Sequence, residues 1–171
     1  MNPDVSVIIP TYNRRAMVRE AVASVMTQRC ASAGIVIEVI VVDDGSTDGT
    51  AEELERLAGE VHAEGADSMR MRVVGTENRG VAAARNTGAA NASAPLIAFL
   101  DSDDLWLPHK LERQVVFMKA HREYAIAQTE EIWVRSGRRV NPGLRHRKRA
   151  GDIFRDSLRT CLISPSAVIL R

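Results

Sequence analysis

The chain has 171 residues and a formal net charge of +1, a length that suits one folded domain. Hydrophobic residues make up 45% of it and charged residues 26%, which is ordinary for a soluble globular protein and gives no indication of a nucleic-acid ligand. No apolar run approaches the roughly 18 residues of a membrane span, and the N-terminus lacks the basic start of a signal peptide. Because Cys30 and Cys161 lie in no metal-binding pattern, we expect free thiols and a reducing, cytoplasmic location.

Apolar runs and helical patterns alternate through the first 120 residues. Strands are predicted over 5–10, 35–42, 70–75 and 96–100, and helices over 16–28, 49–62, 80–92 and 107–119. Pro10 is expected to end the first strand, because it has no N–H for a central sheet ladder. Such alternation predicts right-handed crossovers and an α/β fold with a mainly parallel sheet flanked by helices.

The pattern is less regular from residue 121 onward. Here we expect a strand over 124–135, a short helix over 152–158 and a second strand over 163–170. The chain stops at Arg171 within strand-like sequence, so the fold is expected to continue beyond this residue.

Two aspartate clusters each follow an apolar run. Asp43 and Asp44 follow Ile40-Val41-Val42, and Asp101-Ser102-Asp103 follows Leu96-Ile97-Ala98-Phe99-Leu100. In open α/β sheets, ligands bind beyond the carboxyl ends of the parallel strands. Carboxylates at that place suit two uses, holding a divalent metal and accepting hydrogen bonds from a polar ligand. The clusters therefore predict a site for a nucleoside diphosphate whose charge is neutralised by a metal.

Each cluster also has a purely structural interpretation. Asp104 would cap the following helix, and the run from Asp43 to Asp48 would form a turn and a helix N-cap. We prefer the functional interpretation of Asp101-Ser102-Asp103, because it follows five apolar residues and precedes Leu105-Trp106-Leu107-Pro108. In the first cluster, a single aspartate would be enough to form the Asp-Gly turn. The pair therefore favours a carboxylate that accepts the N3–H of uracil or thymine, a donor that cytosine lacks.

Two further segments carry side chains suited to a nucleotide. Pro10-Thr11-Tyr12 follows the first strand, where the Tyr12 ring would either stack on a base or cover the sheet edge. Gly80 and Arg85 lie in a stretch where guanidinium groups would either meet a phosphate or stay solvated. The segment after the first strand is not glycine-rich, which argues against a sugar-phosphate nucleotidyltransferase.

Together, the segment Val5–Arg14, the run Asp43–Thr50, the block Asn78–Asn86 and Leu100–Asp104 resemble the family 2 glycosyltransferases. The resemblance covers residues 4–119 and implies the GT-A fold, a nucleotide-binding, Rossmann-like α/β sandwich. It also implies metal-dependent transfer of a sugar from a nucleotide-sugar to an acceptor hydroxyl, with inversion at the anomeric carbon. The donor is expected to be linked to UDP or dTDP.

The resemblance assigns roles to the matched positions. The implied nucleotide-binding residues are Pro10, Thr11, Tyr12, Asp43, Asp44, Gly80, Arg85, Asp101 and Ser102, and the implied ligands of Mn²⁺ or Mg²⁺ are Asp103 and Asp101. Tyr12 would stack on the base, and either Asp43 or Asp44 would accept from its N3–H. Asp103 would be the principal metal ligand, with Asp104 as a further contributor.

Residues 1–171 are expected to form one domain, with 1–120 as the strong match and 121–171 as a partial acceptor-side region. Family members usually carry an acidic catalytic base in a later segment, and Glu130-Glu131 lies too early to match it. The base is therefore expected beyond Arg171. Inverting transfer needs such a base, so we expect these residues to bind donor but to transfer sugar poorly. The alternative is a nucleotide-binding module without turnover.

A basic run, Arg145-His146-Arg147-Lys148-Arg149, lies in the irregular region. It is either a solvated loop or a patch that attracts an anionic acceptor, such as a lipid-linked phosphate, or an anionic membrane. Nucleic acid is a poorer candidate and is not an expected partner, because the acidic clusters would repel it and no aromatic residues are interleaved. The expected partners are a nucleotide-sugar donor and a glycan or lipid-linked acceptor of polysaccharide or cell-envelope synthesis. Peripheral membrane contact and a homodimer formed through exposed apolar surface are further expectations.

Overall fold

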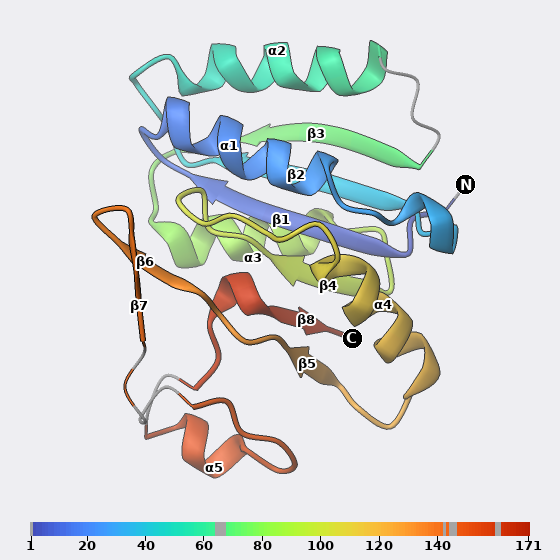
Figure 1. Ribbon diagram of the computed structural model, residues 1–171. Coiled ribbons are helices and arrows are strands. Elements are labelled where there is room, and N and C mark those ends of the chain that lie inside the picture. Colours follow the sequence, from blue (N-terminus) through green and yellow to red (C-terminus); the bar gives the residue numbers. More distant parts are fainter. Residues whose placement is uncertain (1, 64–67, 142, 144–146, 160–161) are drawn as a thin grey trace.

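The computed structural model describes residues 2–63, 68–141, 143, 147–159 and 162–171. Its centre is a six-stranded sheet in the order β3-β2-β1-β4-β8-β5 (Figure 1). The strands are β1 (Val5–Thr11), β2 (Ile37–Asp43), β3 (Met69–Gly75), β4 (Leu96–Phe99), β5 (Ile126–Gln128) and β8 (Val168–Leu170). The first four strands run parallel, and β8 runs antiparallel to both β4 and β5. The predicted mainly parallel sheet is confirmed.

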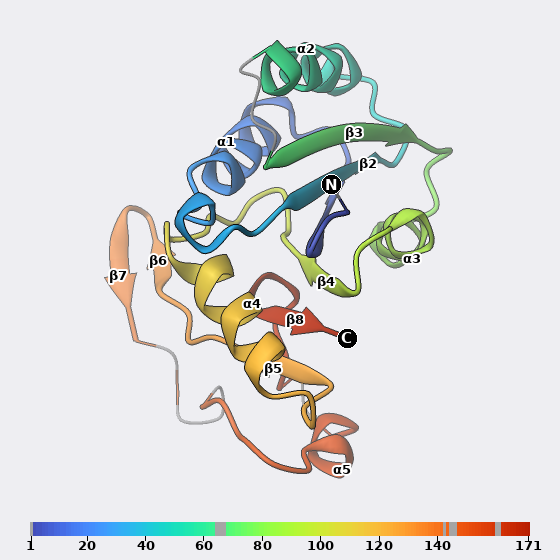
Figure 2. The same ribbon diagram turned by 90° about the vertical axis from the view of Figure 1, so that its right-hand side faces the viewer.

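Helices cover both faces of this sheet. They are α1 (Arg15–Met26), α2 (Thr50–Ala63), α3 (Val81–Asn91) and α4 (Lys110–Ala120). Figure 2 shows α1 and α4 on one face and α3 on the other, with α2 above the edge strand β3. None of the helices in the described ranges is long and apolar enough to cross a membrane.

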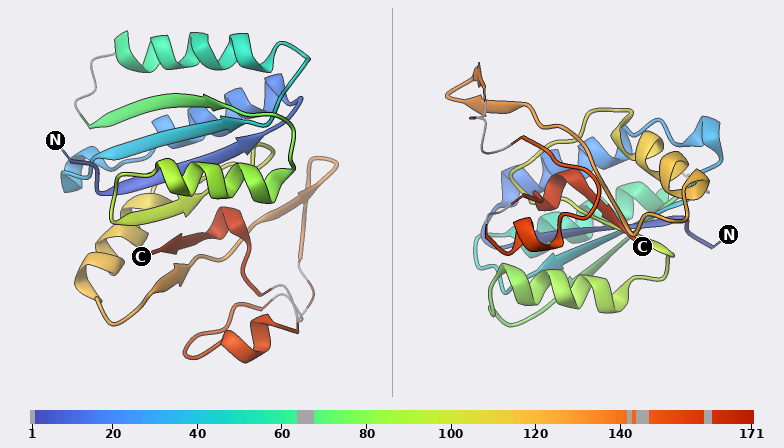
Figure 3. Two further views of the ribbon diagram at one scale, coloured as in Figure 1. Left: turned by 180° about the vertical axis from the view of Figure 1, so that it is seen from behind. Right: turned by 90° about the horizontal axis from the view of Figure 1, so that it is seen from below.

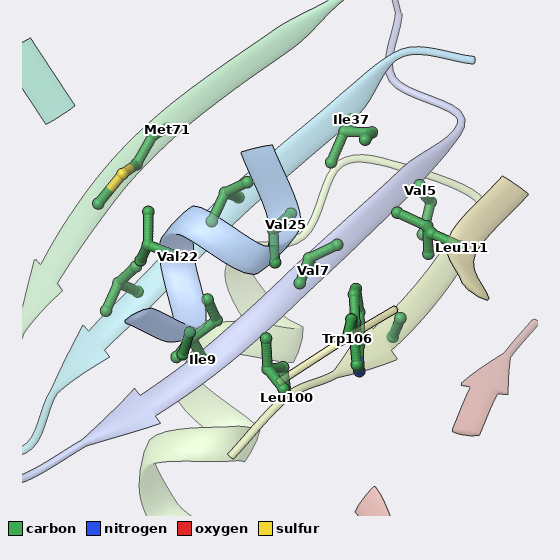
Figure 4. Close-up of a cluster of buried hydrophobic side chains, with 14 of the residues drawn as sticks. Val5, Val7, Ile9, Val22, Val25, Ile37, Met71, Leu100, Trp106 and Leu111 are labelled. Carbon is green, nitrogen blue, oxygen red and sulfur yellow. The ribbon is translucent and has the colours of Figure 1, made fainter. Parts of the chain in front are cut away.

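The main hydrophobic cluster lies between the sheet and the helices on the α1 side (Figure 4). Val7 and Ile9 of β1 meet Val22 of α1 there, and all three are fully buried. Burying a side chain of this size contributes about 1.5–3 kcal/mol to folding. Cys30 belongs to the same cluster as a free thiol, and burial raises its pKa to about 11. Cys161 lies outside the described residues.

β1 extends one residue beyond Pro10, so the prediction that this proline ends the strand is wrong. Pro10 is the register partner of Val42 in β2. Successive residues of a strand direct their backbone groups to alternate sides, and the carbonyl of Ile8 accepts from Leu100 N on the β4 side. The missing N–H of Pro10 therefore also faces that side. Because β4 pairs with β1 only as far as Phe99, no ladder bond is lost there.

The predicted single strand over 124–135 is wrong. The structure has β5 and then a separate hairpin of β6 (Trp133–Arg135) and β7 (Arg138–Val140). Ser136 and Gly137 connect these strands with φ angles of 49° and 72°, the backbone of a tight two-residue hairpin turn. Figure 3 shows the hairpin projecting away from the central sheet.

The other C-terminal predictions are correct only in part. The helix expected over 152–158 is present as α5 (Phe154–Ser157), and the strand expected over 163–170 is limited to β8. Pro165 begins a single 3₁₀ turn, η3 (Pro165–Ala167), before that strand. Proline has no N–H for a sheet and its fixed φ suits the first position of a helical turn, which explains the shorter strand.

Gly88 allows α3 to pack directly against β1. Gly88 and Ala84 are the buried residues of this helix. A Cβ atom at Gly88 would lie 2.3 Å from Cγ2 of Ile8, whose side chain is fully buried. The close approach of helix and sheet therefore requires the absence of a side chain at this position.

We expect Gly88→Ala to lower the free energy of unfolding by about 1–3 kcal/mol, because overpacking at Ile8 outweighs the better helix propensity of alanine. Gly59→Ala is the matched control. Gly59 lies in α2, an added Cβ there would meet no atom within 4 Å, and the variant should gain up to about 1 kcal/mol. Urea unfolding measures both changes. A Gly88→Ala variant as stable as the wild type would contradict the close contact.

Candidate nucleotide-binding site

The two aspartate clusters lie at the same edge of the sheet. Thr11 and Asp43 are register partners at the carboxyl ends of β1 and β2, and Asp44 N donates to Thr11 O at 2.9 Å. The second cluster follows β4, which pairs in parallel with β1. Figure 1 shows the arrowheads of β1, β2 and β4 pointing the same way, so that both clusters emerge at the carboxyl edge. This is the edge at which open α/β sheets bind ligands.

The fold itself uses the carboxylate of Asp44. This residue is buried, and its Oδ1 accepts from Arg79 N at 3.0 Å and from Thr76 Oγ1 at 3.2 Å. Its Oδ2 accepts from Gly80 N at 2.7 Å, just before α3. Gly80 has a φ of 88°, in the region that favours glycine. Asp44 therefore connects β2 to the loop before α3 and has both oxygens engaged.

Asp43 is also buried, but only one of its carboxylate oxygens is engaged by the described residues. Its Oδ1 accepts from Ser46 N at 3.2 Å and from the Ser46 hydroxyl. Its Oδ2 accepts none of the hydrogen bonds that the described residues make. The two neighbouring aspartates, which the sequence does not distinguish, therefore have different environments.

Two buried polar atoms at this edge, Thr11 Oγ1 and Arg85 Nε, have no hydrogen-bond partner among the described residues. Thr11 is only 3% exposed. Arg85 extends from α3, and its Nη2 donates to Asp101 Oδ1 at 2.5 Å, which places the guanidinium beside the second cluster. Leaving a buried polar atom unpaired costs about 1–3 kcal/mol, so such atoms are rare and call for an explanation. A polar ligand at the carboxyl edge would supply one.

Residues 101–106, the aspartate loop, present carboxylates with two different arginine partners. Asp101 pairs with Arg85, as described above. Asp103 pairs with Arg14, which precedes α1, at 2.5 Å between Nη1 and Oδ2. Both partners of the second pair are almost half exposed. Asp103 therefore faces the solvent side of the edge, and Arg14, which the sequence did not single out, joins the site.

Asp104 points back toward the protein. Its Oδ2 accepts from Ser166 Oγ at 2.6 Å. Partial loss of solvent raises the pKa of Asp104, and the negative charges of Asp103, Asp101 and Glu131 raise it further against the opposing hydrogen bond from Ser166. Because the charges of all three carboxylates act on the pKa of Asp104, they lie within electrostatic range of this residue.

The structural interpretations of the clusters are partly correct. Asp48 accepts from Thr50 N at 3.1 Å at the start of α2, as expected of a residue that caps a helix. Asp104 does not cap α4. This helix begins at Lys110, later than the predicted 107–119, and its N-cap residue His109 makes no capping side-chain bond.

The other predicted site residues lie along the same edge. Tyr12 is 45% exposed, so its ring is not buried as a cover for the sheet. Pro10 and Ser102 are buried, at the end of β1 and in the aspartate loop respectively. Asn13, which was not predicted, connects two loops, because its Oδ1 accepts from Thr47 N at 2.7 Å.

A divalent metal fits this site only together with a ligand. Among the described residues, no group of three or more His, Cys, Asp or Glu side chains is placed to hold an ion. Asp101 and Asp103 offer carboxylate oxygens, which Mg²⁺ and Mn²⁺ prefer. Magnesium sites often use one or two carboxylates and complete the shell with phosphate oxygens and water. The residues present therefore fit a metal that binds with a diphosphate.

Glu131 and part of the basic run are engaged with each other. Lys148 Nζ lies 2.6 Å from Glu131 Oε1, and Trp133 Nε1 donates to Glu131 Oε2 at 2.9 Å. Arg149 pairs with Asp156 at 2.5 Å. The first two residues of the run, 145 and 146, lie outside the described residues. The run is therefore partly neutralised within the protein.

The chain is similar to known proteins over most of its length. Residues 6–171 match the family model described as glycosyl transferase family 2. A protein from Rickettsia felis named as an uncharacterized glycosyltransferase is 35% identical over 171 residues, a match that covers 96% of this chain. It covers 25% of that protein, so the chain spans about a quarter of the length of this relative.

Two solved structures share the fold. The mannosyltransferase PcManGT from Pyrobaculum calidifontis, in complex with GDP-Man and Mn²⁺, is 26% identical with a TM-score of 0.69, and the match covers 99% of this chain and 45% of that one. S. aureus TarS 1–349 in complex with UDP-GlcNAc is 24% identical with a TM-score of 0.70, covering 98% and 45%. These likenesses confirm the GT-A architecture. Because the family model matches residues 6–171 of its 171 residues, the chain belongs to glycosyltransferase family 2.

Proposed function

We propose that this chain binds the nucleoside diphosphate part of a nucleotide-sugar, and that the protein transfers the sugar to an acceptor hydroxyl with inversion. One observation carries the proposal. Thr11 Oγ1 and Arg85 Nε are buried without partners among the described residues, at the edge where Asp43 keeps a carboxylate oxygen. All three belong to the positions at which the resemblance expects donor contacts. The membership of the chain in family 2 supports the same activity.

Asp43 is proposed as the residue that recognises the base. Its Oδ2 would accept the N3–H of uracil or thymine, whereas both oxygens of Asp44 are already used within the protein. Guanine presents an N1–H of the same kind, but cytosine presents none, so a cytosine nucleotide would offer Oδ2 of Asp43 no hydrogen bond. Tyr12 has the exposed ring needed to stack on the base.

The aspartate loop is proposed to hold the diphosphate through a divalent metal. Asp103 and Asp101 would be the protein ligands of Mn²⁺ or Mg²⁺, which when bound would act as a Lewis acid on the leaving diphosphate. PcManGT, named in complex with Mn²⁺, supports this choice. Arg14 and Arg85 now neutralise these two carboxylates. With the metal in place, their guanidinium groups would be available for phosphate oxygens.

The experiment is calorimetric titration of UDP, dTDP, GDP and CDP, each with and without Mn²⁺. We expect UDP or dTDP to bind only with Mn²⁺, and CDP to bind at least about tenfold more weakly, because cytosine offers Oδ2 of Asp43 no N3–H to accept. GDP tests whether the site accepts a larger base that presents an N1–H in place of the N3–H. Equal affinity for CDP and UDP would contradict the role of Asp43, and absence of binding by all four would contradict the function.

A second measurement separates the enzyme from the alternative of a binding module. Release of sugar from a radiolabelled donor, to water or to acceptor, is expected of a transferase, whereas a module would bind the donor unchanged. The acceptor is proposed to be a glycan or a lipid-linked anionic molecule of polysaccharide or cell-envelope synthesis. Peripheral membrane contact and a homodimer stay predictions.

A further inference from the structure

Ser166, in the η3 turn just before β8, contacts both ends of the aspartate turn formed by Asp101 through Asp104. Its Oγ accepts from Asp101 N at 3.0 Å and donates to Asp104 Oδ2 at 2.6 Å. The turn is closed by Asp104 N, which donates to Asp101 O at 3.0 Å. The backbone of Ser166 adds a third contact, because Trp106 Nε1 donates to its carbonyl at 2.7 Å. One residue from the C-terminal part thus holds the loop at three points.

The segment that carries Ser166 is itself firmly anchored. The next carbonyl, that of Ala167, accepts from Gln114 Nε2 of α4 and from Thr129 N, each at 3.0 Å. Ala167 is buried, and Pro165 fixes the first φ of the turn. A hydroxyl fixed in this way has little freedom to move, so it can impose its position on the loop that it contacts.

We propose that Ser166 is a positioning residue that holds the aspartate loop in the shape in which Asp101 and Asp103 bind the metal and diphosphate. The inference rests on the proposed function. Asp103 lies between the two bonded positions, so its orientation depends on the turn being closed. Loss of the hydroxyl would leave Asp101 N unpaired and Asp104 free to rotate.

The chain offers a closely matched control in Ser6. Its Oγ donates to the carboxylate of Glu38 and accepts from Ala94 N at 3.2 Å, the same kinds of partner that Ser166 has. Ser6 lies near the amino ends of the strands, where β1 pairs with β2 and β4, away from the aspartates. Ser6→Ala therefore removes an equivalent pair of hydrogen bonds near the amino ends of the strands, far from the carboxyl edge.

The test compares Ser166→Ala, Ser166→Thr and Ser6→Ala by UDP titration with and without Mn²⁺. We expect Ser166→Ala to lose about tenfold in Mn²⁺-dependent affinity, the usual effect of one hydrogen bond to a charged group. Ser166→Thr, which keeps the hydroxyl, should recover most of it. Ser6→Ala should bind UDP as the wild type does. The midpoint of thermal unfolding should fall by a similar amount in Ser6→Ala and in Ser166→Ala, because each loses two hydrogen bonds.

Amide hydrogen exchange at Asp101 provides a readout that does not need a nucleotide. The amide should be protected in the wild type and in Ser6→Ala, and should exchange faster in Ser166→Ala. Equal exchange in all three, or equal loss of affinity in Ser166→Ala and Ser6→Ala, would overturn the positioning role. A wild-type protein with a protected Asp101 amide and no affinity for any nucleotide would overturn the proposed function, and with it the role of Ser166 in binding.

Discussion

Asp103→Asn is expected to weaken Mn²⁺-dependent UDP binding by about a hundredfold or more. Loss of residues that only orient a metal ligand already costs about 10–100-fold, so loss of the principal ligand should cost at least the upper value. The amide that replaces the carboxylate keeps the shape of the side chain but lacks the charge that a hard cation requires. Calorimetric titration of UDP with and without Mn²⁺ measures the loss.

The fold should tolerate this change. The Asp103–Arg14 pair is almost half exposed on both sides, and an exposed pair contributes at most about 1 kcal/mol. Urea unfolding should therefore show nearly unchanged stability, so that the loss of affinity is attributable to the site.

Glu131→Gln is the matched control, because it removes one nearby negative charge without removing a proposed metal ligand. Glu131 lies close enough for its charge to raise the pKa of Asp104, as the charge of Asp103 does. It is occupied by Lys148 and is not proposed to bind metal. If Glu131→Gln weakened binding as much as Asp103→Asn, the effect would be general electrostatic attraction of the cation, and the assignment of Asp103 as a ligand would be wrong.

The regular part of the fold was predictable because the pattern and the connectivity agree. Short apolar runs between helical patterns admit few arrangements other than a parallel sheet, and β1 to β4 follow that arrangement. The position of the aspartates at the carboxyl edge follows from the same connectivity. The error at Pro10 arose because the rule against proline in a central strand holds only where both neighbours are paired, and β4 is shorter than β1.

The C-terminal part shows what local pattern misses. Ser136-Gly137, directly after the predicted strand, is a sequence pair typical of a tight turn, and this pair indicates a hairpin there. The contacts of Ser166 had no such signal. Its partners Asp101 and Asp104 lie 65 and 62 residues away in sequence, so only the folded chain brings them together.

The distinction between Asp43 and Asp44 also depends on distant residues, because Arg79 N and Gly80 N lie 35 and 36 positions beyond Asp44. Asp44→Asn should lower the free energy of unfolding by about 2–3 kcal/mol, since an amide group would replace one acceptor and oppose a partly buried backbone N–H. The change should be measured by urea unfolding.

Asp43→Asn is the isosteric counterpart with the opposite result. The amide oxygen of the new side chain can still accept from Ser46, so stability should fall by less than about 1 kcal/mol. Its NH₂ group would then stand where Oδ2 of Asp43 is proposed to accept the N3–H of the base, and UDP binding should be lost. Of these two adjacent buried aspartates, Asp44 would thus stabilise the fold and Asp43 would recognise the base. Comparable destabilisation by both variants would contradict the structural difference between the two aspartates. Retention of UDP binding by Asp43→Asn would contradict the role of Asp43 Oδ2 in binding the base.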